Sequence, residues 1–237
     1  MVVLALDTSA AGGSAAVVRV AGEQTIVIES AGDEARPHGE RLPLELMAVL
    51  REAETAIADV DRLAVVVGPG SFTGLRVGIA TIQGLALARG LNVTPVSTFE
   101  ALAWHAHGST DAVAAWVDAH RGEVFATLLA PDARTVLAPP TALTPEATLD
   151  SWREALAPFA RVQFLGNGAV RYRDVIGERL GLQAEVDAVA PMLAAAAGSI
   201  AATEPTRAVP PHALVPQYVR RPDVELARDR RQAAAKS

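Results

Sequence analysis

The sequence predicts a mixed α/β fold made of two halves that share one plan. Short apolar strands alternate with amphipathic helices in the first half, as expected for a sheet whose later strands are joined by crossovers. Each half opens with a β-hairpin, at residues 2–6 with 15–20 and at 112–118 with 123–129. Half of the residues are hydrophobic and 20% are charged, which is typical of a compact globular protein.

The first domain is expected to span residues 1–107. Its opening hairpin is followed by a third strand at 25–29 and by an amphipathic helix over 39–58, where apolar residues recur at helical spacing. A buried strand at 61–67 leads into a glycine-rich turn and a second helix over 75–89, which Gly90 ends. A strand at 93–96 and a helix at 99–107 complete the domain.

The second domain is expected to span residues 108–237. After its hairpin, the sequence predicts a loop-rich stretch at 131–145, a helix at 149–157 and a strand at 162–165. The remaining expected elements are a helix at 172–180, an Ala-rich helix at 192–203, a proline-bearing connection at 205–216 and a charged tail at 223–237. This division is compatible with a final segment that packs back on the first domain.

Composition excludes several classes of protein. The formal net charge is -6 and aromatic residues make up 4%, so a broad nucleic-acid surface is disfavoured. The absence of cysteine excludes disulfides, thiolate metal sites and a cysteine nucleophile. The N-terminal stretch lacks a signal peptide's basic region and long apolar core, and no apolar run is long enough to span a membrane. A cytoplasmic protein is therefore expected.

The first candidate site is Asp7-Thr8-Ser9, at the end of the first strand and just before Gly12-Gly13. A carboxylate beside the amides of a tight turn can hold a hydrated metal ion near a phosphate. The alternative is an Asx-turn that closes the hairpin, and the motif alone favours this alternative.

The second candidate site is the glycine-rich turn at residues 68–78, which joins a strand to a helix. Close glycines allow backbone to approach an anion, and the following helix offers unpaired N–H groups. The candidate phosphate-binding residues are Gly68, Gly70, Ser71, Thr73 and Gly74. No Gly-Lys-Ser/Thr follows, so this is not a Walker loop. A structural turn that lets the helix lie tightly on the sheet explains the same spacing equally well.

The third candidate site is the hairpin at residues 118–125, which carries Asp118, Arg121 and Glu123 together with His120. Such a cluster suits a substrate or partner clamp, although solvated turn charges are commoner. The sequence holds no His-x-x-x-His pair and no Gly-x-Ser-x-Gly elbow, so we expect no metal site and no serine nucleophile.

These stretches resemble the TsaB (YeaZ) family in residues 4–9, 68–78, 118–125 and 216–220, which occur in the family's order and span most of the chain. Phe72, Thr73 and Arg76 are the most specific part of the resemblance. It implies two related actin/Hsp70-like (ribonuclease H-like) domains, with mixed sheets flanked by helices. The chain departs from the family pattern at Gly39, His120 and Phe125, where serine, arginine and tyrosine are usual.

The resemblance also implies a function. Members of the family are non-catalytic partners of TsaD, which with the ATPase TsaE forms N6-threonylcarbamoyladenosine on tRNAs that read codons beginning with A. TsaD has a His-x-x-x-His metal pair that this chain lacks. No cofactor is then required, although weak binding of ATP or ADP with Mg is compatible with the resemblance. The resemblance also allows the isolated chain to form a homodimer, and it implies that the chain contacts tRNA only within the complex.

In the family the partner surface lies on the first two helices of the N-terminal domain, here 39–58 and 75–89. Both carry more apolar residues than one buried stripe needs, which suits a helix-bundle interface. Deeper burial within the monomer is the alternative. The predicted interface residues are Leu42, Leu46, Met47, Leu50, Leu75, Arg76, Ile79, Ile82, Gln83 and Leu87, with Ala86 beside the last of them.

Two other functions are alternatives, and the residues fit only the first of them. An actin-like phosphotransferase would use Asp7 to hold magnesium and another carboxylate, such as Asp118, as its base. An M22-type glycoprotease would need metal ligands or a nucleophile that the sequence does not offer.

Overall fold

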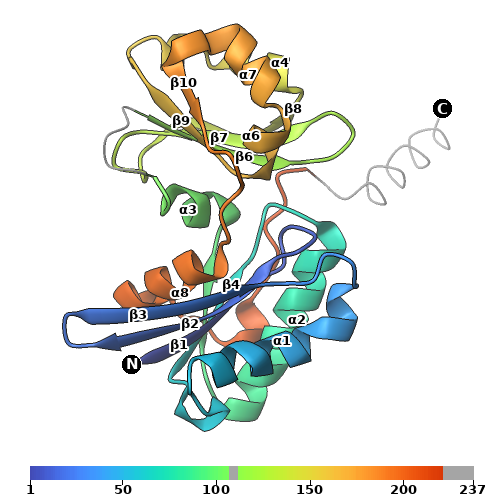
Figure 1. Ribbon diagram of the computed structural model, residues 1–237, viewed down its shortest axis with the longest axis vertical. Coiled ribbons are helices and arrows are strands. Elements are labelled where there is room, and N and C mark those ends of the chain that lie inside the picture. Colours follow the sequence, from blue (N-terminus) through green and yellow to red (C-terminus); the bar gives the residue numbers. More distant parts are fainter. Residues whose placement is uncertain (107–111, 221–237) are drawn as a thin grey trace, which may run out of the picture.

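The computed structural model describes residues 1–106 and 112–220, which form two five-stranded mixed sheets flanked by helices (Figure 1). The first sheet has the strand order β3-β2-β1-β4-β5. β1 pairs antiparallel with β2 and parallel with β4, so the opening hairpin continues into a crossover-linked sheet. Its strands are β1 (Val2–Asp7), β2 (Ser14–Ala21), β3 (Gln24–Ala31), β4 (Arg62–Val66) and β5 (Val93–Val96).

Helices cover both faces of the first sheet (Figure 1). α1 (His38–Glu52) and α2 (Phe72–Arg89) pack side by side on one face, and α8 (Ala194–Thr203) packs on the other. α8 follows the second sheet in sequence, so the chain returns to the first domain late. Its small residues allow close contact, since a Cβ on Gly198 would lie 2.6 Å from a Val18 methyl group.

The second sheet has the order β10-β9-β6-β7-β8 and repeats the hairpin-then-parallel plan. Its core contains Trp116, with Trp152 and Phe164 edge-on at ring centroid distances of 6.1 and 5.4 Å. The elements of this domain are β6 (Ala112–Asp118), β7 (Val124–Leu129), β8 (Val136–Leu143), β9 (Val162–Leu165), β10 (Ala184–Val186), α4 (Pro145–Ser151), α5 (Arg153–Leu156), α6 (Asn167–Arg171), α7 (Arg173–Leu180) and the 3-10 turn η2 (Gly181–Gln183).

Residues 205–220, here called the C-terminal segment, run back along the first domain and then reach the second. Val209 bridges Val93 at the edge of β5, and the Gln217 amide donates to the carbonyl of Val67. Farther on, Arg220 pairs with Glu123 of the second domain. Short helices α3 (Thr98–Ala103), η1 (Ile57–Asp59), η3 (Pro205–Arg207) and η4 (Pro211–Ala213) complete the connections.

Several expected boundaries need correction. The helix expected over 39–58 ends at Glu52, and the stretch expected to be loop-rich contains β8 despite Pro139 and Pro140. Prolines are tolerated there because β8 is an edge strand that does not need every amide. The helix expected at 149–157 is broken at Trp152, and β10 was not anticipated. The expectations for residues 107–111 and for the tail at 223–237 lie outside the described residues.

The predicted C-terminal limit of α2 agrees with the structure, whereas the helix begins at Phe72 and not at Leu75, where it was expected. Ser71 caps the first turn, its Oγ accepting from the Gly74 amide, and Gly90 ends the helix in the left-handed region at φ 64°. Over residues 1–106 and 112–220, no helix combines the length and apolar character that crossing a membrane requires.

Candidate functional site

The first candidate motif forms a buried Asx-turn at the end of β1. Asp7 is almost fully buried, and its Oδ1 accepts a hydrogen bond of 2.8 Å from the Ser9 amide. Burial raises the pKa of Asp7 to about 6; the Ser9 amide opposes this rise, and nearby Glu29 adds to it. The hydrogen bond from the Ser9 amide to Asp7 closes this turn, as the Asx-turn interpretation expects.

α1 holds the following β1–β2 turn from its other side. The buried Arg41 guanidinium donates to the carbonyls of Ala11 and Gly12, at 2.9 and 2.6 Å, and pairs with Glu45. His38 lies beside it, its Nε2 3.2 Å from the Ala10 carbonyl and its Nδ1 2.6 Å from Arg41. Burial, then the charge of Arg41, lowers the pKa of His38, so the neutral ring donates at Nε2 and accepts at Nδ1.

The glycines of the second candidate motif pack against the Asp7-Thr8-Ser9 turn. A Cβ at Gly70 would lie 2.4 Å from the Ser9 carbonyl oxygen, and one at Gly74 would lie 2.2 Å from that of Thr8. One turn farther along α2, a Cβ at Gly78 would lie 2.1 Å from Thr8 Oγ1. The recurrence every four residues therefore places a glycine at three contacts with this turn, one just before α2 and two within it. Close packing alone accounts for the spacing.

The start of α2 is covered by the late motif at residues 216–220. The Phe72 ring stacks on Tyr218 with centroids 5.4 Å apart, and the Arg76 guanidinium carbon lies 3.8 Å from the Phe72 centroid. Arg76 Nε also donates to the Tyr218 hydroxyl at 3.1 Å. The sequence pointed to both motifs but not to their contact, because that contact joins segments far apart in the chain. The cluster fixes the C-terminal segment on the glycine turn.

The space beside Asp7 between the two domains is small. A cavity of about 40 Å³ lies there, between the β1 turn and the start of α6. Sites for drug-sized ligands are usually ~300–1,000 Å³, so this cavity suits a water or an ion but not a nucleotide. Its lining residues include Asp7, Ser9, Thr98, Gly166, Asn167 and Leu193.

The third candidate motif has its carboxylates engaged in ion pairs. Asp118 Oδ2 accepts from Arg171 Nη1 at 3.0 Å, and His120 Nδ1 lies 3.6 Å from the same oxygen. Glu123 pairs with Arg220. Arg121 lies in the turn itself, at φ 56°. The hairpin therefore contacts α6 within the second domain and binds the C-terminal segment through Arg220, which is a structural role for these charges.

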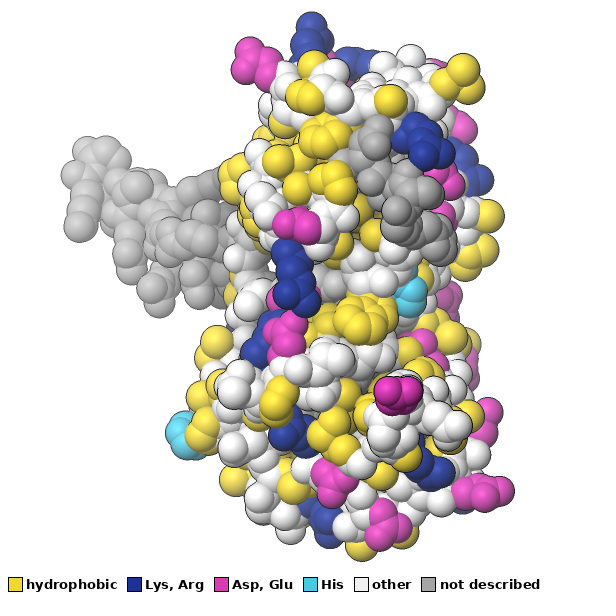
Figure 2. Space-filling view, turned by 90° about the vertical axis from the view of Figure 1, so that its left-hand side faces the viewer, with side chains coloured by type: hydrophobic (Ala, Val, Ile, Leu, Met, Phe, Trp, Pro, Cys, Tyr) yellow, Lys and Arg dark blue, Asp and Glu magenta, His cyan; other side chains and the backbone are white. Residues whose placement is uncertain are grey.

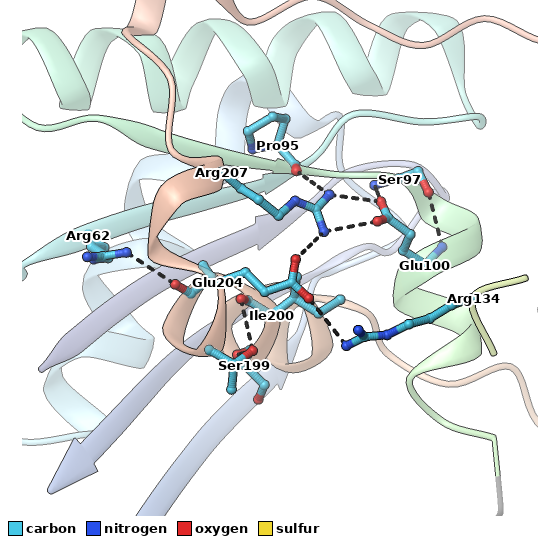
Figure 3. Close-up of polar contacts among 11 residues, drawn as sticks. Arg62, Pro95, Ser97, Glu100, Arg134, Ser199, Ile200, Glu204 and Arg207 are labelled. Atoms are coloured by element: carbon cyan, nitrogen blue, oxygen red, sulfur yellow. Dashed lines mark hydrogen bonds and ion pairs between the residues drawn. The ribbon is translucent and has the colours of Figure 1, made fainter. Parts of the chain in front are cut away.

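A larger cleft on another side of the domain junction was not predicted. It has a volume of about 780 Å³ and is lined by the β7–β8 region, α3 and the C-terminal segment. Arg207 forms ion pairs of 3.0 Å with Glu100 and 3.2 Å with Glu204 (Figure 3). Arg134 of the second domain forms a further ion pair of 3.4 Å with Glu204. Burial raises the pKa of Glu100, but Arg207 and the Ser97 amide outweigh it, and the pKa is lowered. The charges thus largely compensate one another.

The predicted partner surface on α1 and α2 divides into buried and exposed residues. Seven of the residues in question pack in the core of the first domain: Leu42, Leu46, Leu50, Leu75, Ile79, Ile82 and Ala86. Their placement on a surface is therefore corrected. The chain's own C-terminal segment adds to this burial, since Gln83 Nε2 donates to the carbonyl of Pro211 at 2.9 Å and Leu214 joins the same core. Met47 and Leu87 remain exposed.

No group of three or more His, Cys, Asp or Glu suited to a metal ion occurs among residues 1–106 and 112–220.

Comparisons with known proteins agree with one another. Residues 30–167 match the family described as TsaD, tRNA N6-adenosine threonylcarbamoyltransferase. The tRNA threonylcarbamoyladenosine biosynthesis protein TsaB of Bacillus subtilis is 26% identical over 95% of this chain and 96% of its own length. That of Escherichia coli is 41% identical over 38% of this chain and 40% of its own.

Solved structures show the same likeness. A solved structure of YeaZ from Pseudomonas aeruginosa superposes with a TM-score of 0.70 and 29% identity, covering 92% of this chain and 99% of that one. Two mycobacterial relatives of uncharacterized function are matched over only 34% and 62% of their own lengths. The predicted fold class, mixed α/β with two flanked sheets in an actin-like arrangement, is confirmed.

Proposed function

Because the chain belongs to the TsaB/YeaZ branch of the TsaD-type threonylcarbamoyltransferase family, we propose that it is the non-catalytic partner of TsaD in forming N6-threonylcarbamoyladenosine on tRNA. In this proposal it acts in the cytoplasm, needs no cofactor of its own, and meets TsaE and tRNA only within the complex. The tRNAs are those that read codons beginning with A.

The observation that carries the proposal is an apolar face on α1 and α2 that the first domain leaves uncovered. Leu44 is 64% exposed, Met47 49% and Leu87 71%. We call this surface, together with the exposed small residues Ala80, Gly84 and Ala88 of α2, the helix face. Small residues let a second helix approach closely, and exposed apolar side chains gain by being buried. Helices of a sister subunit would fit such a face.

The non-catalytic part of the proposal is supported by the space around Asp7. The adjoining cavity of about 40 Å³ cannot accept a nucleotide in this conformation. Asp118, the carboxylate considered as a base for phosphotransfer, is already paired with Arg171. Both features argue against the phosphotransferase alternative.

The proposal is tested by co-purifying the chain with TsaD of the same organism. Met47→Glu and Leu87→Glu should each remove the complex, because a buried, unpaired carboxylate is strongly unfavourable. Leu182→Glu is the matched control: Leu182 is an equally apolar, fully exposed residue in the second domain. A complex that survives both helix-face variants would contradict the proposed interface.

A second measurement tests the absence of catalysis. The isolated chain is titrated with Mg-ATP by calorimetry, and phosphate release is followed in parallel. We expect neither tight binding nor turnover. Sustained phosphate release that Asp7→Asn abolishes would favour the phosphotransferase instead.

A further inference from the structure

The cluster of Phe72, Arg76 and Tyr218 holds one guanidinium group in a fixed position at the surface. The Arg76 guanidinium carbon lies 3.8 Å from the centroid of the Phe72 ring, and Arg76 Nε donates to the Tyr218 hydroxyl at 3.1 Å. Arg76 is exposed, and no hydrogen bond or ion pair from residues 1–106 or 112–220 reaches its Nη1 or Nη2. The cluster therefore fixes the arginine while leaving its two terminal nitrogens without an acceptor in the described part of the chain.

Arg76 lies on the side of α2 that carries the helix face. Residues spaced by four and seven positions share one side of a helix, and Arg76, Ala80 and Leu87 follow this spacing and are all exposed. At 1.5 Å per residue, Arg76 lies about 16 Å from Leu87 along the helix axis. This end of α2 begins beside the domain junction, where the C-terminal segment crosses to the second domain (Figure 1). A helix docked on the helix face would therefore meet apolar residues and, at one end, a single cation of α2.

The way Arg76 is held suits recognition of a partner. An arginine loses side-chain entropy when it binds, and one that a ring and a hydroxyl already hold loses less. Arginine and tyrosine are also enriched among the residues that dominate binding at protein interfaces. Arg51 of α1 is exposed too, but within the described part of the chain its one polar contact runs from Nε to the Met47 carbonyl, at 3.3 Å. Arg51 is therefore a natural comparison for Arg76.

The terminal nitrogens of Arg76 call for an anion, and the surroundings favour a carboxylate on a protein. A guanidinium binds a carboxylate or a phosphate through two parallel N–H bonds. On the side of the molecule away from α1 and α2, basic and acidic side chains lie next to one another, so charges there can compensate within the chain (Figure 2). Arg76 instead adjoins exposed apolar residues, which a protein partner covers. The formal net charge of -6 also disfavours a phosphate backbone.

We propose that Arg76 forms a bidentate ion pair with a carboxylate on the TsaD helix that docks on the helix face, and that this pair fixes where the helix lies along α2. The inference rests on the proposed function, because it takes TsaD as the partner. Apolar contacts with small residues give affinity at more than one position along a helix, whereas a charge pair at one end selects a single register. Phe72 and Tyr218 act as positioning residues, since they reach the partner through Arg76.

Calorimetric titration with TsaD of the same organism tests the ion pair, after circular dichroism has shown that each variant is folded. Arg76→Met keeps an apolar stem over the Phe72 ring but removes the guanidinium, and it should weaken the complex by at least about tenfold. Arg51→Met, the matched control, should change the affinity by less than about twofold. Arg76→Lys keeps the charge without the fork and should recover part of the loss. Wild-type affinity in Arg76→Met or in Arg76→Lys would overturn the bidentate pair.

A double-mutant cycle tests whether Tyr218 acts through Arg76. Tyr218→Phe removes the hydrogen bond to Arg76 Nε but keeps the ring that stacks on Phe72, and it should weaken the complex by about threefold. In the Arg76→Met background the same substitution should have no further effect, because the group that it positions is gone. Equal effects in both backgrounds would show that Tyr218 acts independently of Arg76 and would refute its positioning role.

Charge exchange identifies the partner group. Arg76→Glu should weaken the complex more than Arg76→Met, and changing the aspartates and glutamates of the docking TsaD helices to lysine, one at a time, should restore binding at one position. If no exchange restores it, the ion pair is wrong. If Arg76→Met binds TsaD normally but the complex retains less tRNA, the arginine binds phosphate and the proposal also fails. A wild-type chain that does not bind TsaD would overturn the proposed function itself, whereas loss of binding in Met47→Glu but not in Arg76→Met would overturn this inference alone.

Discussion

Two glycine-to-alanine substitutions in α2 separate packing from binding as the reason for its glycines. A Cβ at Gly74 would lie 2.2 Å from the Thr8 carbonyl oxygen, whereas one at Gly84 would meet no atom within 4 Å. Both residues lie in the same helix, so the change in helix propensity is similar. Gly74→Ala tests the contact with the β1 turn, and Gly84→Ala is its matched control.

The magnitudes follow from two opposing effects. Replacing glycine by alanine inside a helix stabilises it by about 1 kcal/mol. Overpacking costs about 1–3 kcal/mol, and the upper end applies at Gly74 because a backbone carbonyl must move. We therefore expect Gly84→Ala to raise the unfolding free energy by about 1 kcal/mol and Gly74→Ala to lower it by about 2 kcal/mol. At roughly 2–4 °C per kcal/mol, the midpoints should differ by about 6–12 °C.

Far-UV circular dichroism during urea and thermal unfolding measures both variants. Packing predicts opposite signs for the two substitutions. If Gly74→Ala is as stable as the wild type, the turn and the helix can separate without loss, and the packing interpretation of the glycine spacing fails. If it instead retains stability but loses binding of a phosphate-bearing ligand, the anion-binding interpretation is supported.

Two further predictions concern titratable groups. Burial raises the pKa of Asp7 from 3.8 to about 6, so the stability that its protonated form contributes is complete below about pH 4 and is lost by about pH 6. As the pH rises through this window, the unfolding free energy of Asp7→Asn should therefore gain up to ~3 kcal/mol over that of the wild type in urea unfolding series. A difference that does not change with pH would contradict a buried carboxyl at this position. Arg207→Met should raise the pKa of Glu100 in a carboxyl NMR titration, whereas Arg134→Met, which contacts Glu204 instead, should leave it unchanged; equal effects would refute the direct pairing.

The parts of the fold that sequence predicted well are those with local signals. The hairpins follow from alternation, and the end of α2 follows from Gly90 as a stop. β8 was missed because two prolines normally argue against a strand, and only its position at an edge makes them acceptable. That position is a property of the assembled sheet.

The candidate site shows the same limit more sharply. Local sequence could not decide whether the glycines at 70, 74 and 78 approach a ligand or another part of the chain, since both need backbone without side chains. The answer depends on Thr8 and Ser9, which are distant in sequence. Likewise, Phe72 and Tyr218 belong to motifs that only the fold brings together.

Contacts within the chain explain the residues on one side of α2 but leave the exposed apolar and small residues on its other side unexplained. One side, with Leu75, Ile79 and Ile82, packs in the core of the first domain, and Gln83 binds the returning C-terminal segment. Those contacts account for much of the apolar excess that the sequence showed. They do not account for Leu87, whose exposure to water costs free energy. Nor do they account for the exposed Gly84 beside it, where a Cβ would meet no other atom within 4 Å. A helix docked from another subunit would give both features a physical purpose.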